Sequence, residues 1–169
     1  MKKLLFIWLV GVLVFLFESC SESRQVKYVF YFIGDGMGVN QVNGTEMYLA
    51  ERDSVIGVKG LSFASFPVRN YATTYSSYHG VTCSAAAGTA LATGEKTKNG
   101  TIGMDKEQKK PLYSVAVRAK EAGRKVGIIT SVGMNHATPA AFYGHQPRRT
   151  MYFELGKDAI RTGFDLYGG

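Results

Sequence analysis

The 169-residue sequence has only two cysteines, Cys20 and Cys83, and only three histidines. A small scaffold stabilised by disulfides needs more cysteine pairs, so that class of fold is excluded. The histidines are too few and too scattered along the sequence to form a zinc-binding cluster by themselves. Because no disulfide framework is present, the stability of the fold must come from packing or from metal bound with the help of other residues.

A long hydrophobic run is also lacking, because no segment approaches the roughly 20 apolar residues that span a bilayer. The longest run, residues 4–17, follows two lysines and precedes polar residues and Cys20. This pattern predicts a signal peptide over residues 1–19, with Cys20 as the new, lipid-modified N-terminus of a bacterial lipoprotein. An ordinary signal peptide that happens to end near a cysteine is the alternative. In both cases we expect an exported protein, in the periplasm or anchored to the outer membrane.

Charge of one sign does not dominate any segment, although the formal net charge is +7. The 20 basic residues are spread along the chain without a basic helix or an aromatic platform, so no nucleic acid is expected as a specific partner. The positive field favours a small anionic substrate instead. With 46% hydrophobic and 20% charged residues, the composition is that of a globular domain.

Predicted strands and helices alternate along the chain, which favours an α/β fold with a mostly parallel sheet. The strands are expected at residues 27–33, 69–75 and 124–132, with the edge of another at 164–169. Helices are expected at residues 40–52, 84–93, 111–123, 136–145 and 150–163, and a loop at 94–110.

Several polar residues follow the ends of the predicted strands. In open α/β sheets, ligands bind beyond the carboxyl ends of the strands, so these residues are expected at one rim. Asp35, in Gly-Asp-Gly, suits a hard metal ion, although an Asx turn would explain it equally well. His136 and Thr138 follow the strand at 124–132, and Arg149 could bind phosphate oxygens in a bidentate manner.

Ser84 begins an alanine-rich helix, where it could be a simple N-cap or a nucleophile stabilised by the helix terminus. The neighbouring Cys83 is the competing nucleophile. A cysteine phosphatase needs an arginine six positions on, where this chain has Thr89, and a sulfatase needs proline and arginine shortly after the cysteine. The spacing of Gly88 and Gly94 also fails the Walker pattern. Ser84 is therefore preferred.

Three motifs together resemble those of alkaline phosphatases: YFIGDGMG, TCSAAAGTALATGEKTKNGTIG and HATPAAFYGHQPRR. The resemblance runs from about residue 27 to the end of the chain. It implies a three-layer αβα sandwich, incomplete here, and hydrolysis of phosphate monoesters to inorganic phosphate with two Zn²⁺ and one Mg²⁺. A homodimer is one assembly that we consider for the protein. A membrane contact would come from the lipid anchor predicted at Cys20.

The same resemblance implies roles for individual residues. Ser84 would form a covalent phosphoserine and also contact metal, and Asp35 would bridge zinc and magnesium. His136 and Thr138 would belong to the magnesium site, while Arg149 would bind two phosphate oxygens. Two departures matter: Cys83 stands where many members have an aspartate that orients the arginine, and His136 is a poor magnesium ligand.

Family members are substantially longer and place further metal ligands downstream. We therefore expect residues 20–169 to be the amino-terminal part of a phosphatase domain, inactive and poorly folded alone. The alternative is an exported lipoprotein that binds phosphate or a phosphorylated ligand without turnover. A phosphodiesterase or phosphotransferase of the same superfamily is a third interpretation.

Overall fold

The computed structural model describes residues 26–169, which divide into two units, up to Ile33 and from Gly34 onward. The predicted signal peptide and Cys20 lie outside the described residues. Within residues 26–169 no helix has the length and apolar character needed to cross a membrane.

Two of the predicted strands are not formed in the part of the chain that the structure describes. Residues 27–33 and 69–75 are extended but belong to no sheet. Along residues 27–33, side chains at odd and at even positions are both exposed, for example Phe30 at 79% and Tyr31 at 53%. A strand exists only when a neighbour pairs with its backbone groups, so the β-rich composition of these segments is not sufficient.

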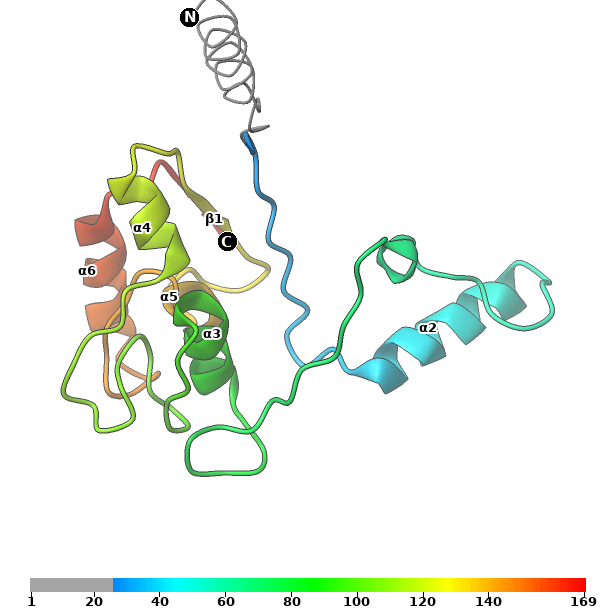
Figure 1. Ribbon diagram of the computed structural model, residues 1–169, viewed down its shortest axis with the longest axis horizontal. Helices are drawn as coiled ribbons and strands as arrows, with labels where there is room; N and C mark the ends of the chain where they lie inside the picture. The colour runs from blue at the N-terminus through cyan, green and yellow to red at the C-terminus, as the bar shows by residue number, and fades with distance from the viewer. Residues whose placement is uncertain (1–25) are drawn as a thin grey trace, which may run out of the picture. The chain divides into compact units, whose positions relative to one another are not determined.

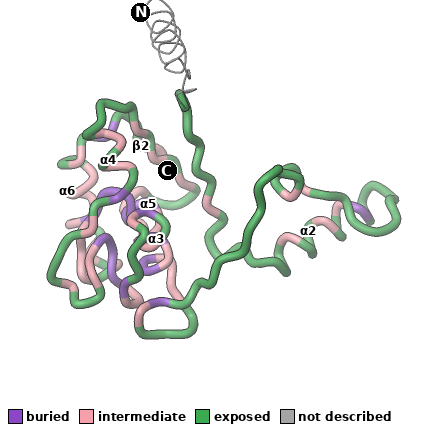
Figure 2. Tube along the Cα trace, in the orientation of Figure 1, coloured by how far each residue is buried: buried purple, intermediate pink, exposed green. Residues whose placement is uncertain are grey.

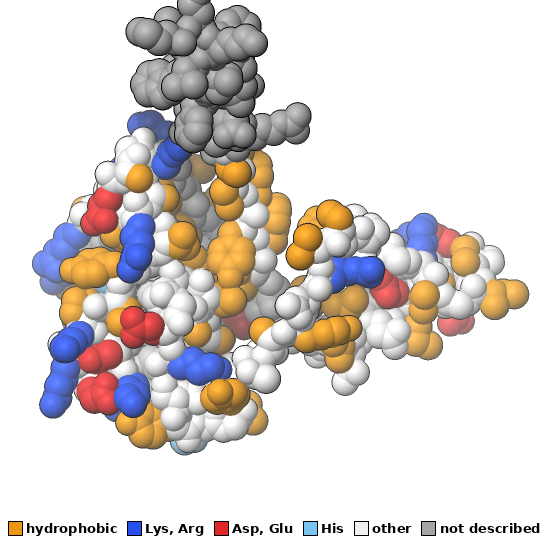
Figure 3. All heavy atoms as spheres, viewed as in Figure 1, with side chains coloured by type: hydrophobic (Ala, Val, Ile, Leu, Met, Phe, Trp, Pro, Cys, Tyr) orange, Lys and Arg blue, Asp and Glu red, His pale blue; other side chains and the backbone are white. Residues whose placement is uncertain are grey.

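Helix α2 spans Val39–Arg52, close to the predicted 40–52. The side chain of Gln41 accepts a hydrogen bond from the Gly38 backbone N–H at 3.0 Å, which satisfies one free donor at the helix start. A short 3₁₀ helix, η1, follows at Ser62–Ser65. Hydrophobic side chains remain exposed along α2 and the segment after it (Figure 3).

Helices α3 to α6 and a small sheet form the packed body of the second unit (Figure 1). Helix α3 spans Ser84–Thr93, the predicted range, and packs against α5 at Ala137–Ala140. Most of the buried segments gather around these two helices, and a further one lies at the end of α2 (Figure 2). A Cβ on Gly88 would lie 3.1 Å from the Cβ of Ala141, so the small residues of α3 allow a close approach.

The remaining helices differ from prediction mainly at their ends. Helix α4 spans Val115–Glu121 and begins after Ser114, whose hydroxyl accepts a hydrogen bond from the Val117 N–H at 3.1 Å. The predicted start at Pro111 was wrong, because Pro111 forms an antiparallel bridge with Met104. Helix α5 is shorter than the predicted 136–145, and α6 at Tyr152–Thr162 is as expected.

The sheet of the described residues has two parallel strands, β1 at Gly127–Ile129 and β2 at Leu166–Gly168. Gly127 pairs with Leu166, so the strands expected at 124–132 and 164–169 both form, and they pair in the parallel sense expected for the sheet. The core beside the sheet consists of buried residues from the helices and loops: Ala85, Ile102, Ala137, Ala140, Tyr143, Leu155 and Phe164.

The loop at 94–110 is predicted correctly as a loop, but it is packed rather than solvated. Thr97, Thr101 and Ile102 are fully buried, and Ile102 forms an antiparallel bridge with Gln146. A Cβ on Gly103 would lie only 2.0 Å from the carbonyl oxygen of Gly144, so no other residue fits there without displacing the backbone.

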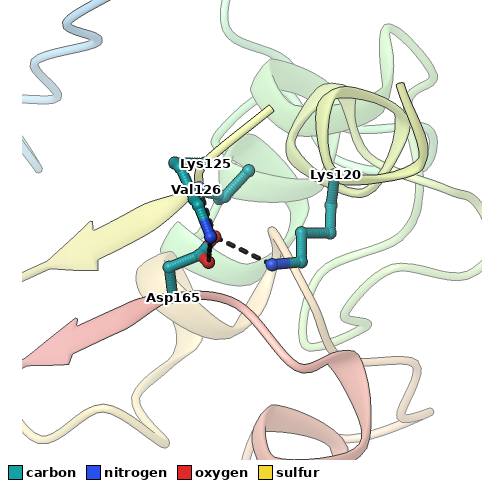
Figure 4. Close-up of polar contacts among 4 residues, drawn as sticks. All are labelled: Lys120, Lys125, Val126 and Asp165. Atoms are coloured by element: carbon teal, nitrogen blue, oxygen red, sulfur yellow. Dashed lines mark hydrogen bonds and ion pairs between the residues drawn. The ribbon is translucent and has the colours of Figure 1, made fainter. Parts of the chain in front are cut away.

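Asp165 ties the start of β2 to the segments before β1 (Figure 4). Its carboxylate accepts hydrogen bonds from Lys120 Nζ at 2.8 Å, from the Val126 N–H at 2.9 Å and from Lys125 Nζ at 3.0 Å. Lys120, the Val126 N–H and Lys125 hold the pKa of the Asp165 carboxyl well below its usual range.

We expect Asp165→Asn to lower the stability of the protein at neutral pH. A carboxyl with a depressed folded pKa stabilises above its unfolded pKa of about 4, and this contribution is lost as pH falls further. Urea unfolding from pH 7 to pH 3 should therefore show a stability difference between wild type and variant that narrows below about pH 4. Glu107→Gln, at an exposed carboxylate paired loosely with Lys106 at 3.8 Å, is the control. If the difference in unfolding free energy between wild type and Asp165→Asn stayed constant with pH, the stabilising role of the Asp165 carboxylate would be contradicted.

Candidate active site

The carboxylate of Asp35 meets two hydroxyls from distant parts of the chain. The Ser84 hydroxyl donates a hydrogen bond to Asp35 Oδ1 at 3.2 Å, and the Thr138 hydroxyl donates one to Oδ2 at 2.9 Å. These partners lie 49 and 103 positions further along the sequence. Three of the five residues predicted for the catalytic and metal sites are thus brought together.

A tight turn presents Asp35. The Met37 N–H donates to the Gly34 carbonyl at 3.1 Å, and Gly36 has a φ of +70°, a conformation that glycine adopts without strain. The aspartate itself is exposed. The turn therefore leaves both carboxylate oxygens accessible to the hydroxyls.

Ser84 is the first residue of α3 and is half-buried. The N-cap position belongs to Cys83, so the interpretation of Ser84 as a simple N-cap is wrong. Its hydroxyl is directed to Asp35 instead. The positive end of the helix dipole lies at this terminus and favours negative charge there.

The Cys83 thiol is half-buried and its sulfur accepts a hydrogen bond from the Gly100 N–H at 3.1 Å. Burial alone would raise the pKa of this thiol. The backbone N–H groups of Ala86, Gly100 and Ala85, together with the charge of Arg149, outweigh that effect and lower the pKa of Cys83 below its ordinary value. The sulfur is thus part of a hydrogen-bonded backbone environment.

Thr138 and His136 lie two residues apart but face different surroundings. Thr138 is in α5 and bonds to Asp35, whereas His136 is the N-cap of α5 and its ring stacks on Tyr152 with centroids 6.1 Å apart. Within residues 26–169 the ring nitrogens of His136 have no hydrogen-bond partner. The structure does not bring His136 into the hydrogen bonds around Asp35.

Arg149 is half-buried, and its backbone N–H donates to the Gly100 carbonyl at 2.7 Å. Gly100 in turn donates to the Cys83 sulfur, which brings the backbone of Arg149 near the start of α3. Across the described part of the chain the guanidinium takes part in no hydrogen bond or ion pair. It therefore remains available for an anion.

The oxygens of Asp35, Ser84 and Thr138 fit part of the coordination of a hard divalent cation, for which carboxylate and hydroxyl oxygens are suitable ligands. Only one of the three is a carboxylate. No group of three or more His, Cys, Asp or Glu side chains gathers into a metal site between residues 26 and 169. The described residues can thus contribute to a metal site without completing one.

Sequence reasoning missed Asn99 and Gly100, which lie between the Ser84 and Arg149 segments. The side chain of Asn99 bonds to the backbone on both sides of Thr82, and Gly100 bonds to both Cys83 and Arg149. Their Asn-Gly-Thr triplet occurs a second time at Asn43, inside α2. What set the triplet at Asn99 apart was its place within the second of the three motifs, residues 82–103.

Comparison with known proteins gives one consistent result. The family model described as alkaline phosphatase matches residues 26–165. Alkaline phosphatase 4 of Drosophila melanogaster is 33% identical over 86% of this chain, and alkaline phosphatase 4 of Bacillus subtilis is 36% identical over 76%. The chain spans 26% and 28% of the lengths of these two curated relatives.

Solved structures agree with the sequence relatives. The alkaline phosphatase from the Antarctic bacterium TAB5 superposes with a TM-score of 0.70 and 30% identity, covering 80% of this chain and 37% of its own. A mutant of that enzyme with Mg bound matches over 56% of this chain and 27% of its own, with a TM-score of 0.55 and 32% identity. The α/β class is confirmed, as an incomplete alkaline-phosphatase-like fold. The chain belongs to the alkaline phosphatase family.

Proposed function

We propose that the whole protein hydrolyses phosphate monoesters through a phosphoserine at Ser84. The observation that supports this most directly is the meeting of the Ser84 and Thr138 hydroxyls at the Asp35 carboxylate, at the start of an α-helix. Membership of the alkaline phosphatase family supports the same reaction class.

In the first step, Ser84 Oγ bonds to phosphorus and its proton passes to solvent. The bond between phosphorus and the ester oxygen breaks, and that oxygen takes up a proton to leave as an alcohol. In the second step, the oxygen of a water molecule bonds to phosphorus and the bond to Oγ breaks. Inorganic phosphate leaves and Ser84 regains its proton, so the enzyme is restored.

Arg149 is proposed to bind two oxygens of the phosphoryl group. Its guanidinium has no competing partner within residues 26–169, and its backbone is joined through Gly100 to Cys83, the residue before Ser84. A planar guanidinium can donate two parallel hydrogen bonds to phosphate oxygens. The positive end of the α3 dipole would add to this anion binding.

Two Zn²⁺ and one Mg²⁺ are proposed as cofactors, with Asp35, Ser84, His136 and Thr138 contributing to the sites. Bound cations supply charge that favours loss of the serine proton and offsets charge on the reacting oxygens. Of these residues, Asp35, Ser84 and Thr138 already share hydrogen bonds, whereas His136 would have to leave its stack with Tyr152. We also propose that the 169-residue chain alone is inactive, because its described residues offer only part of a metal site.

Ser84→Ala in the whole protein is expected to lower kcat for a chromogenic aryl phosphate by about 10³-fold or more, since the nucleophile is removed. Ser62→Ala, at an exposed serine of η1, should leave kcat unchanged. Tight binding of inorganic phosphate without any turnover in the wild type would favour the alternative, a phosphate-binding lipoprotein. Turnover that survives Ser84→Ala would contradict the phosphoserine.

Dialysis of the whole protein against a chelator is expected to abolish hydrolysis, and Zn²⁺ with Mg²⁺ should restore it. Asp35→Ala should reduce the number of ions retained, measured by mass spectrometry of the metals, because a ligand of the site is lost. Asp53→Ala, at an aspartate paired with Arg52, is the control and should retain all ions. Equal metal content in the Asp35 and Asp53 variants would show that Asp35 is no ligand.

Export as a lipoprotein is proposed from the pattern of residues 1–20. Cells expressing the protein should incorporate labelled palmitate into it, and Cys20→Ser should abolish that incorporation because the attachment thiol is removed. Cys83→Ser, at the second cysteine, should keep the label. Label that persists in Cys20→Ser would exclude this anchor, and a secreted, unlabelled wild type would favour an ordinary signal peptide.

A further inference from the structure

The dipeptide Asn99–Gly100 lies between the segment that leads into Ser84 and the segment that holds Arg149. It makes four hydrogen bonds, three to residues 81–83 and one to residue 149. These two segments are separated by more than sixty positions in the sequence, so their relation depends on contacts of this kind.

The side chain of Asn99 uses its donor and its acceptor on the same stretch of backbone. Its Oδ1 accepts from the Cys83 N–H at 3.2 Å, and its Nδ2 donates to the Val81 carbonyl at 3.0 Å. A short side chain with both a donor and an acceptor is needed for this pairing, which asparagine provides and alanine does not. The approach of the chain to the first residue of α3 is thereby fixed.

Gly100 extends the connection to Arg149. Its N–H donates to the Cys83 sulfur at 3.1 Å, and its carbonyl accepts from the Arg149 N–H at 2.7 Å. Its φ of +87° lies where side chains are strained, so glycine allows this arrangement. One residue thus contacts the neighbour of the proposed nucleophile and the backbone of the proposed phosphate-binding arginine.

The loop around this dipeptide is held in place by buried contacts. Thr101 is fully buried, and the Gln108 amide donates to its hydroxyl at 2.8 Å and to the Pro147 carbonyl at 2.6 Å. Ile102 and Gln146 exchange two backbone hydrogen bonds, at 3.0 and 2.9 Å. A displacement of Asn99 would therefore be transmitted to both segments rather than absorbed by a mobile loop.

We propose that Asn99 is a positioning residue that sets the placement of Arg149 relative to Ser84 through Gly100. The proposal rests on the proposed function, in which Ser84 attacks phosphorus and Arg149 binds the phosphoryl oxygens. Asn99 does not touch the substrate in this account. Its effect is on the geometry in which the two other residues meet the same phosphoryl group.

The test is a double-mutant cycle in the whole, metal-loaded protein. Asn99→Ala, Arg149→Ala and the double variant are compared with wild type for kcat/KM on an aryl phosphate and for inhibition by inorganic phosphate. We expect Asn99→Ala to lower kcat/KM by about 10-fold or more and to raise the inhibition constant of phosphate. In the Arg149→Ala background, the same substitution should lower kcat/KM by less than about 3-fold, because the arginine that Asn99 positions is absent.

Asn43→Ala is the matched control, because Asn43 begins an identical Asn-Gly-Thr triplet but lies exposed in α2. It should leave both constants unchanged. If Asn99→Ala fails to fold, Asn99→Asp enters the cycle under the same criterion, since it keeps the acceptor for the Cys83 N–H and loses the donor to the Val81 carbonyl.

Each outcome decides the proposal. The positioning role would be overturned if the losses of kcat/KM in Asn99→Ala and Arg149→Ala multiply in the double variant and Asn99→Ala leaves the inhibition constant of phosphate unchanged. The proposed function would then still stand. If the single variants Arg149→Ala and Ser84→Ala both kept full activity, the proposed function would be contradicted, and the positioning role with it. The positioning role would be supported if Asn99→Ala weakens inhibition by phosphate and if its loss of kcat/KM is smaller in the Arg149→Ala background.

Discussion

The site depends on one carboxylate that accepts hydrogen bonds from two hydroxyls. Asp35 comes from a turn near the start of the described chain, Ser84 from the first turn of α3 and Thr138 from α5. Each hydroxyl would be an ordinary surface group if it were separated from the carboxylate. Their meeting at Asp35 brings two hydroxyls and a carboxylate to one point, and oxygens of these kinds are suitable ligands for a hard divalent cation.

Close packing of small residues makes this meeting possible. Helices α3 and α5 approach where Gly88 faces Ala141, and most alanines of the two helices are buried: Ala85, Ala86, Ala92, Ala137 and Ala140. Larger side chains on α3 would separate the helices and move Ser84 away from Thr138. The packed loop at 94–110 has a related effect on the other side of α3, since Gly100 contacts Cys83 and Arg149. The nucleophile segment is therefore held between two sets of close contacts.

Local sequence predicted those features that local interactions determine. The ranges of α2, α3 and α6 were close to prediction, and the parallel sense of the sheet follows from the alternation of strands and helices. The strands at 27–33 and 69–75 failed because pairing depends on distant neighbours. Asp35, Ser84 and Thr138 were expected at one rim and do meet, but the strand at 27–33 on which that expectation rested pairs with no other strand of the described residues. Asn99 was not predictable, because its partners are backbone groups that only the fold brings near.

The central claim is that Asp35 is a ligand of a divalent cation that also contacts Ser84. Anomalous diffraction at the zinc absorption edge, from crystals of the active whole protein, tests it directly. The account predicts an anomalous peak within about 2.2 Å of an Asp35 carboxylate oxygen and in contact with Ser84 Oγ. Fully loaded, active crystals in which every ion lies away from Asp35, with its carboxylate still bonded to the two hydroxyls, would contradict it.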